Sequence, residues 1–156
     1  MEPRLDILLV DDNPIDLVFF GRAAKRTLFN IRLQTLTAGQ QAIDYLEAKG
    51  AYHDRSRYPW PELIVLDLKM PEVSGFDFLA WRKASALFSS IPVIIFSGSN
   101  EPDDVKRVFE LGANKHIVKP TDLEDWERVI QEIWDFGTQG TAFLKQKGGA
   151  PSSTKR

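Results

Sequence analysis

The chain has 156 residues, 43% hydrophobic and 27% charged, proportions typical of one globular domain with a sizeable core. Its formal net charge is −2, and residues 138–156 hold four of the 20 basic residues and no acid. The other 16 basic residues face 22 acidic ones, so the body carries −6, which argues against a nucleic-acid partner. The absence of cysteine excludes disulfides and thiolate metal sites.

The amino terminus does not resemble a signal peptide, because Arg4 and Asp6 precede a run of only four apolar residues. No apolar run approaches the roughly 18 residues of a membrane span. We therefore expect a soluble, cytoplasmic protein with no membrane partner. After Gly137 the composition shifts to Gly, Ser, Thr, Lys and Gln, so we expect one domain over 1–137 and a flexible basic tail over 138–156.

Short apolar runs alternate with helical patterns along the domain. Continuous apolar runs within 5–10, 63–66 and 92–96 predict strands buried on both faces. The alternating run 31–36 predicts a strand nearer an edge, and 116–118 a short fifth strand. Helices are predicted over about 14–28, 76–87, 102–112 and 122–136. A further helix contains Ala42, Ile43 and Leu46 and ends at Gly50. Five strands alternating with five helices indicate a doubly wound α/β sheet.

The first helix has the clearest start signal. Asn13 is a good N-cap and Pro14 suits the first helical position. Ile15, Val18, Phe19 and Ala23 at near-helical spacing predict its buried stripe.

Aromatic residues gather in two places that this pattern does not explain. Residues 51–61 have no period and contain Tyr52, Tyr58 and Trp60, which predicts an exposed but sticky loop or a helix extension. Near the end of the last helix, Trp126, Trp134 and Phe136 cannot all be buried by one helix face. At least one of these is expected to be exposed or to lie in an interface.

Polar residues follow four predicted strands where each strand ends: Asp11 and Asp12, then Asp67, Ser97 and Lys119. The carboxyl ends of parallel strands share one edge, which is where open α/β sheets bind ligands. If the first and third strands are neighbours, the three carboxylates crowd together. Taken alone, an acidic pair before proline is more often a helix cap than part of a site. A lysine before proline, taken alone, is more often a surface residue than a site residue. The occurrence of all four polar features at strand ends, in chain order, favours a functional site.

Crowded carboxylates need positive charge, because two unit charges about 4 Å apart repel by roughly 4 kcal/mol at an effective dielectric of 20. Lys119 supplies one charge, and a hard divalent cation can supply two. Mg²⁺ takes one or two carboxylates and phosphate oxygens, which suits Asp12 and Asp67 as ligands with Asp11 direct or through water. A backbone carbonyl just after Asp67 could add an oxygen. Carboxylates form aspartyl phosphates, and Asp67 alone on the middle strand is the natural acceptor.

Four segments carry a resemblance to a known family: 9–14 (LVDDNP), 66–71 (LDLKMP) with Gly75, 95–99 (IFSGS) and 117–120 (IVKP). Over about residues 5–136 the chain resembles the receiver domain of two-component response regulators. The resemblance implies a flavodoxin-like (βα)5 fold with strand order 2-1-3-4-5. It also implies that Asp67 accepts phosphate from the phosphohistidine of a sensor histidine kinase.

The same resemblance assigns the remaining site residues. Asp11, Asp12, Asp67 and the Lys69 carbonyl would bind Mg²⁺. Ser97 would turn inward to the phosphoryl group, Lys119 would pair with it, and the bond before Pro120 would be cis. The surface of the fourth helix, fifth strand and fifth helix would then change.

Three positions depart from the family pattern. His116 occupies a switch position that is usually Tyr or Phe, and an imidazole can titrate near neutral pH. Gly98 follows Ser97 and gives that loop unusual freedom. Lys69 lies two residues past Asp67, where side chains are thought to influence the dephosphorylation rate.

The loop 51–61 and the aromatic last helix look similar to stand-alone regulators that serve bacterial phytochrome kinases. We expect a homodimer through 102–112, 116–118 and the last helix, and a phosphoacceptor rather than an enzyme. The main alternative is a receiver-like docking module that takes no phosphate. A haloacid-dehalogenase-like phosphatase would need an acid where Lys69 stands, and an FMN-binding module would need a non-acidic loop after the first strand.

Overall fold

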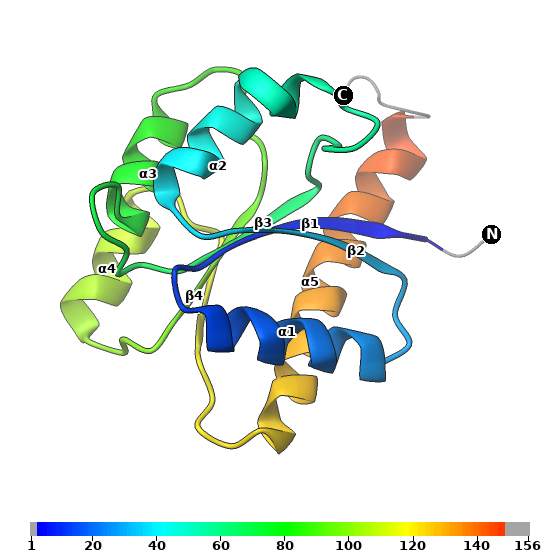
Figure 1. The fold of residues 1–156 in the computed structure, drawn as a ribbon, viewed down its shortest axis with the longest axis vertical. Coiled ribbons are helices and arrows are strands. Elements are labelled where there is room, and N and C mark those ends of the chain that lie inside the picture. The colour runs from blue at the N-terminus through cyan, green and yellow to red at the C-terminus, as the bar shows by residue number, and fades with distance from the viewer. Residues whose placement is uncertain (1–2, 149–156) are drawn as a thin grey trace.

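The computed structural model describes residues 3–148 and contains one five-stranded sheet. All strands are parallel in the order β2-β1-β3-β4-β5, which confirms the predicted flavodoxin-like fold (Figure 1). No helix within the described residues is long and apolar enough to span a membrane. The elements are β1 (Leu5–Val10), α1 (Pro14–Arg26), β2 (Ile31–Leu36), α2 (Gly39–Leu46), η1 (Gly50–His53), β3 (Leu63–Leu66), α3 (Gly75–Lys83), β4 (Val93–Ser97), α4 (Pro102–Glu110), β5 (Lys115–Val118) and α5 (Glu124–Gly148).

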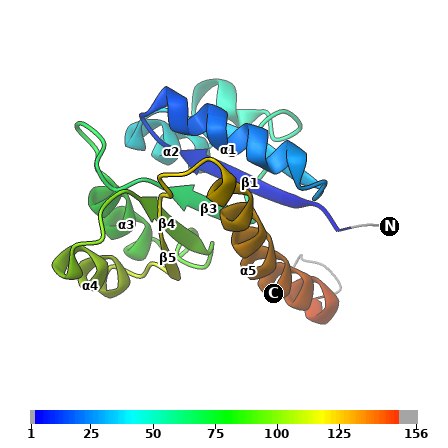
Figure 2. The ribbon, with the colours of Figure 1, turned by 90° about the horizontal axis from the view of Figure 1, so that it is seen from below.

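Helices cover both faces of the sheet, with α1 and α5 on one side and α2, α3 and α4 on the other (Figures 1 and 2). Each side has its own hydrophobic core. In β1, Leu8 and Val10 face the α2–α3–α4 core, whereas Ile7 and Leu9 face the α1–α5 core. This double coverage explains why the central strands are apolar at successive positions instead of alternating.

Helix α1 begins as predicted, because the Asn13 side chain accepts a hydrogen bond from the backbone N–H of Ile15 at 2.9 Å. It ends at Arg26, before Leu28, which has a φ of 66°. The prediction that Ile15 and Val18 belong to the buried stripe is wrong, since their side chains are 59% and 48% exposed. Ala23 is buried as predicted, together with Phe20 and Ala24, and Phe19 is partly buried against the α1–α5 core.

The segment 51–61 begins within the 3₁₀ helix η1, which agrees in part with the predicted helix extension, and its Tyr52 and Tyr58 are partly buried. Tyr52 of η1 and Tyr58 pack against Tyr45 of α2, whose ring centroid is 5.2 Å from that of Tyr52 and 6.0 Å from that of Tyr58. The Tyr45 hydroxyl donates to the Pro59 carbonyl at 2.7 Å. The Arg55 guanidinium donates to the carbonyls of Leu46 and Tyr58. The aromatic residues therefore anchor this segment to the domain.

Helix α5 continues to Gly148, past Gly137, where the sequence suggested an end. Residues 138–148 of the expected flexible tail are thus helical, and 149–156 lie outside the described residues. Gly137 does not stop the helix, because its missing side chain makes room for β1. A Cβ there would lie 2.7 Å from Cδ2 of the fully buried Leu5.

The aromatic residues of α5 are also better packed than predicted. Trp126 is buried, and Trp134 stacks on Phe29 with ring centroids 4.8 Å apart. Phe136 is half-buried against the α1–α5 core. None of the three is exposed, because Phe29 in the α1–β2 connection supplies an additional packing surface. The alternative, that one of them lies in an interface, stays a prediction.

Two glycine-to-alanine substitutions should have opposite effects on stability. Gly137→Ala should lower the free energy of unfolding by roughly 1–3 kcal/mol, because Leu5 is held in a packed core. Gly21→Ala, within α1 where no atom lies within 4 Å of the added Cβ, should raise it by roughly 0.5–1 kcal/mol. Chemical denaturation measures both, and a Gly137→Ala protein as stable as Gly21→Ala would contradict the close approach.

Candidate functional site

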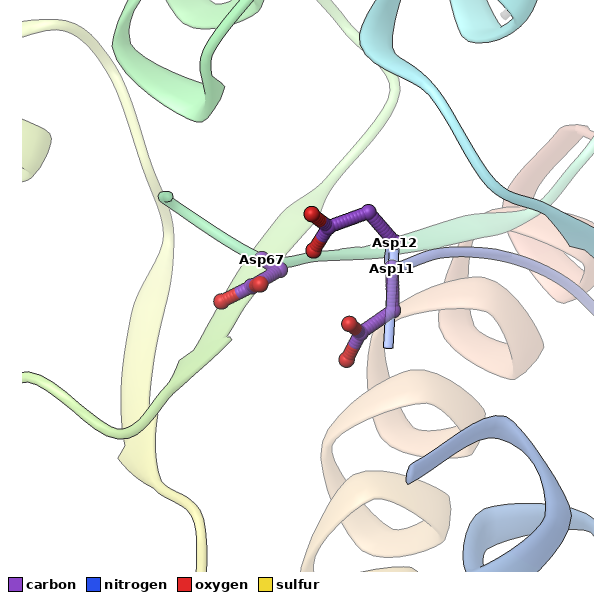
Figure 3. Close-up of side chains that lie close together, drawn as sticks. All are labelled: Asp11, Asp12 and Asp67. Carbon is purple, nitrogen blue, oxygen red and sulfur yellow. The ribbon is translucent and has the colours of Figure 1, made fainter. Parts of the chain in front are cut away.

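Asp11, Asp12 and Asp67 meet at the carboxyl ends of β1 and β3. The strands are paired in register up to Val10 and Leu66, and the Asp67 N–H donates to the Val10 carbonyl at 3.0 Å. One carboxylate oxygen from each aspartate lies within 4.8 Å of the others. Figure 3 shows the three side chains pointing toward one region beyond the strand ends. The predicted crowding therefore follows from strand order and register.

Lys119 reaches this cluster from β5. Its Nζ is 2.8 Å from Asp11 Oδ2, 2.8 Å from Asp16 Oδ2 and 3.6 Å from Asp67 Oδ1. Asp16 is the partner that the sequence analysis missed. It lies in the first turn of α1, just after the carboxyl end of β1, and therefore at the same end of the sheet as Asp11 and Asp12.

The cluster perturbs its own ionisation. Burial, then the nearby Asp11 and Asp12 charges, raise the pKa of Asp67 to about 6, against the lowering effect of Lys119. Burial also raises the pKa of Asp11, although hydrogen bonds from Lys119 and from the Asn13 N–H oppose it. Burial lowers the pKa of Lys119, but its hydrogen bonds to Asp11 and Asp16 outweigh this, so the net shift is upward. The ammonium stays charged while Asp67 is left short of positive charge.

Ser97 ends β4 and is buried, but its hydroxyl is turned toward its own loop. The Ser97 Oγ accepts a hydrogen bond from the Ser99 N–H at 3.2 Å. The Ser99 hydroxyl in turn donates to Asp104 Oδ2 at 2.8 Å, and the Lys69 ammonium lies 3.7 Å from the same oxygen. Ser97 is therefore beside the cluster without a hydrogen bond to Asp67 among the described contacts, and Asp104 joins two of the site's loops.

The remaining predicted residues are placed around this edge. His116 pairs with Ile95 in the sheet and is half-buried, and its Nε2 has no hydrogen-bond partner in the described part of the chain. Gly98 is exposed, and a Cβ there would meet no atom within 4 Å. The Lys119–Pro120 bond is trans, so the expected cis bond is not present. Trans is the intrinsically preferred isomer even before proline.

Gly75 fixes the loop after Asp67. A Cβ at this position would collide with the Asp67 carbonyl oxygen, so the start of α3 can lie directly against the loop only with glycine. The Gly75 N–H donates to the Leu68 carbonyl at 2.8 Å, and Ser74 with Asp77 forms a capping box. The loop that carries the Lys69 carbonyl is thereby held close to Asp67.

The donor set fits a hard divalent cation. Its donors are carboxylate oxygens, the ligands that Mg²⁺ and Mn²⁺ prefer. Burial, with the charges of Asp11 and Asp12, raises the pKa of Asp67 despite Lys119, so a bound cation would stabilise its ionised form. Asp12, which is exposed, and Asp67 are the residues best placed to reach a cation from solvent.

Removing the Asp67 charge should stabilise the domain in a pH-dependent way. Because its pKa is about 6 in the folded protein and near 3.8 when unfolded, the ionised carboxylate destabilises the fold above pH 6, and this penalty disappears below about pH 4. Without divalent cations, Asp67→Asn should therefore gain about 1–2 kcal/mol at pH 7.5 and little at pH 4.5.

Thermal denaturation with and without EDTA measures this difference. Added Mg²⁺ should narrow the gap by stabilising the wild type. Asp103→Asn, at an exposed position on α4, is the matched control and should show no such pH dependence. An Asp67→Asn protein that is less stable than wild type at pH 7.5 would contradict the electrostatic argument.

Three known proteins are similar to this chain in sequence and fold. The response regulator Rcp1 of Synechocystis sp. is 32% identical over 134 residues, covering 86% of this chain and 89% of Rcp1. The solved Mn(2+)-bound form of a response regulator Rcp1 aligns with a TM-score of 0.74 at 32% identity, over 85% of this chain and 93% of that one.

Two further solved structures come from phytochrome response regulators. The phosphorylated cyanobacterial phytochrome response regulator RcpA has a TM-score of 0.78 at 29% identity, covering 86% of this chain and 94% of RcpA. The bacteriophytochrome response regulator AtBRR has a TM-score of 0.68 at 37% identity, covering 83% and 92%. The family model of the response regulator receiver domain matches residues 7–131. The chain therefore belongs to the response regulator receiver domain family.

Proposed function

We propose that this protein is a response regulator that accepts a phosphoryl group on Asp67 from the phosphohistidine of a sensor histidine kinase. One observation carries the proposal: the Asp67 carboxylate stands at the end of β3 with two further carboxylates on one side and the Lys119 ammonium 3.6 Å away. An Asp67 oxygen attacks phosphorus, the P–N bond to the kinase histidine breaks, and a P–O bond forms. The proton that the released imidazole takes up comes from solvent.

The protein's own groups support this transfer by positioning and charge. The raised pKa of Asp67 makes its carboxylate more basic than an exposed aspartate, which strengthens it as a nucleophile. Lys119, held by Asp11 and Asp16, pairs with a phosphoryl oxygen at a fixed place. Mg²⁺, held by Asp11, Asp12, Asp67 and the Lys69 carbonyl, would add two positive charges against the phosphoryl oxygens.

Phosphorylation would be read out through β4 and β5. We infer that the Ser97 hydroxyl leaves the Ser99 N–H and donates to a phosphoryl oxygen, because that group adds strong acceptors to the edge. Gly98, with open space around its Cα, lets the loop follow. His116, whose Nε2 lacks a partner within the described residues, is the side chain we expect to rotate. The surface of α4, β5 and α5 then changes.

Exposed apolar side chains beside the site suggest where the kinase binds. Ile15 and Val18 lie on α1 shortly after Asp12, and the largely exposed Leu123 follows Lys119 and Pro120. Leu123 lines a shallow pocket with Phe19 of α1, so the two elements form one surface. We propose that this surface docks a histidine kinase of phytochrome type, supported by the similarity to RcpA and AtBRR.

We also propose a homodimer through α4, β5 and α5. Phe109 of α4 is 46% exposed and Val118 of the edge strand β5 is 39% exposed, which leaves apolar surface on this face. The Lys115–Glu132 ion pair, at 3.0 Å, links β5 to α5 on the same side. No observation favours the docking module that takes no phosphate, and a cytoplasmic location stays a prediction from the sequence.

Phosphoryl loading should depend on Asp67. With Mg²⁺, acetyl phosphate should give wild type an acid-labile phosphate and beryllofluoride should bind, whereas Asp67→Asn should lose both entirely, since the acceptor carboxylate is gone. Intact-protein mass spectrometry and beryllofluoride titration followed by intrinsic fluorescence measure this. Asp103→Asn, at an exposed position on α4, is the control. Retained phosphate in Asp67→Asn would refute the assignment.

Dimerisation should depend on Phe109. Phe109→Glu should shift the beryllofluoride-bound protein to monomer, because the charge is placed on the proposed apolar interface. Analytical ultracentrifugation over a concentration series measures the shift. Leu87→Glu, which changes an exposed leucine in the α3–β4 connection, should leave assembly unchanged. A wild-type protein that stays monomeric with beryllofluoride at high concentration would overturn the dimer.

A further inference from the structure

Asp104, in the first turn of α4, connects two loops of the site through a single oxygen. Its Oδ2 accepts the Ser99 hydroxyl hydrogen bond at 2.8 Å and lies 3.7 Å from the Lys69 ammonium. Ser99 belongs to the loop after β4, and Lys69 to the loop after β3. Neither the sequence patterns nor the proposed mechanism gives Asp104 a role.

The Lys69 side chain is poorly constrained apart from this contact. It is 68% exposed, and its Nζ has one ion pair, with Asp104, among the described residues. Its backbone lies two positions beyond Asp67, so its long flexible side chain is anchored close to the acceptor. Lys119, by contrast, is already held by Asp11 and Asp16 at 2.8 Å. Lys69 is therefore the cation whose ammonium can move toward a new negative charge on Asp67.

We propose that Asp104 is a positioning residue that competes with the Asp67 phosphoryl group for Lys69. The inference rests on the proposed function, because the competition exists only if Asp67 carries a phosphoryl group. Without phosphate, the Asp104 carboxylate holds Lys69 at the α4 side of the site. With phosphate, the phosphoryl oxygens attract the ammonium, and Asp104 sets how far it is released.

The Ser99 contact couples this competition to the loop after β4. Ser99 donates its N–H to Ser97 Oγ at 3.2 Å and its hydroxyl to Asp104. When Ser97 turns to the phosphoryl group, Ser99 loses an acceptor and its loop can move away from α4. That movement weakens the hold of Ser99 on Asp104 at the same time as Lys69 leaves it. Lys69 release and the Ser97 movement therefore favour one another.

Beryllofluoride affinity, measured with Mg²⁺ at low ionic strength, tests the proposal. Asp104→Asn keeps a similar shape and an acceptor for Ser99 but loses the charge, so it should bind beryllofluoride about two- to fivefold more tightly, the range of an exposed ion pair. Lys69→Ala in the Asp104→Asn background should cancel the gain, and Lys69→Arg should retain it. Raising the ionic strength should reduce the gain.

Asp103→Asn is the matched control, because Asp103 lies on the same helical turn, carries the same charge and makes no ion pair within the described residues. A gain equal to that of Asp103→Asn, or one that persists without Lys69, would show a general charge effect and overturn the proposal. The proposed function is tested separately: it stands if wild type binds beryllofluoride and Asp67→Asn does not. A failure of the Asp104→Asn prediction then concerns the role of Asp104 alone. Thermal denaturation confirms that each variant is folded.

Discussion

The structure depends on holding three carboxylates together at one sheet edge with too little positive charge. Lys119 makes this arrangement possible by contacting Asp11, Asp16 and Asp67 at once. Its charge offsets part of the repulsion but not the cost of burial, so the pKa of Asp67 remains raised to about 6. The buried Asp67 carboxylate thus lowers the stability of the folded domain at the position where a cation and a phosphoryl group would bind.

The strand ends could be predicted because their geometry follows from topology. Once 5–10 and 63–66 are recognised as parallel neighbours, Asp11 and Asp67 must share an edge, and the register of Val10 with Leu66 brings them together. The roles of Asp16 and Asp104 could not be predicted in this way. Each depends on where a long lysine side chain from another element ends, which sequence spacing does not determine.

Tertiary packing also decided two features that local sequence patterns predicted wrongly, the end of α5 and the buried face of α1. Gly137 has the usual appearance of a helix end, yet it is the point where α5 comes closest to Leu5, and the helix continues. Ile15 and Val18 have the spacing of a buried stripe, yet their side chains are largely exposed, and Phe20 and Ala24 are buried beside the predicted Ala23. At Gly137 the close approach of the buried Leu5 side chain requires the small residue, and in α1 the hydrophobicity of Ile15 and Val18 did not place them in the core.

The cluster of Tyr45, Tyr52 and Tyr58 differs in its ionisation from the aspartate cluster around Asp67. It lies between the end of α2 and the start of β3, at the opposite edge of the sheet from Asp67. Burial raises the pKa of Tyr45 to about 12, so its hydroxyl remains a donor to Pro59 throughout the range in which Asp67 titrates. The hydrogen bond that ties 51–61 to α2 is therefore kept whether Asp67 is charged or neutral, so the two ends of the sheet respond differently to pH in this range.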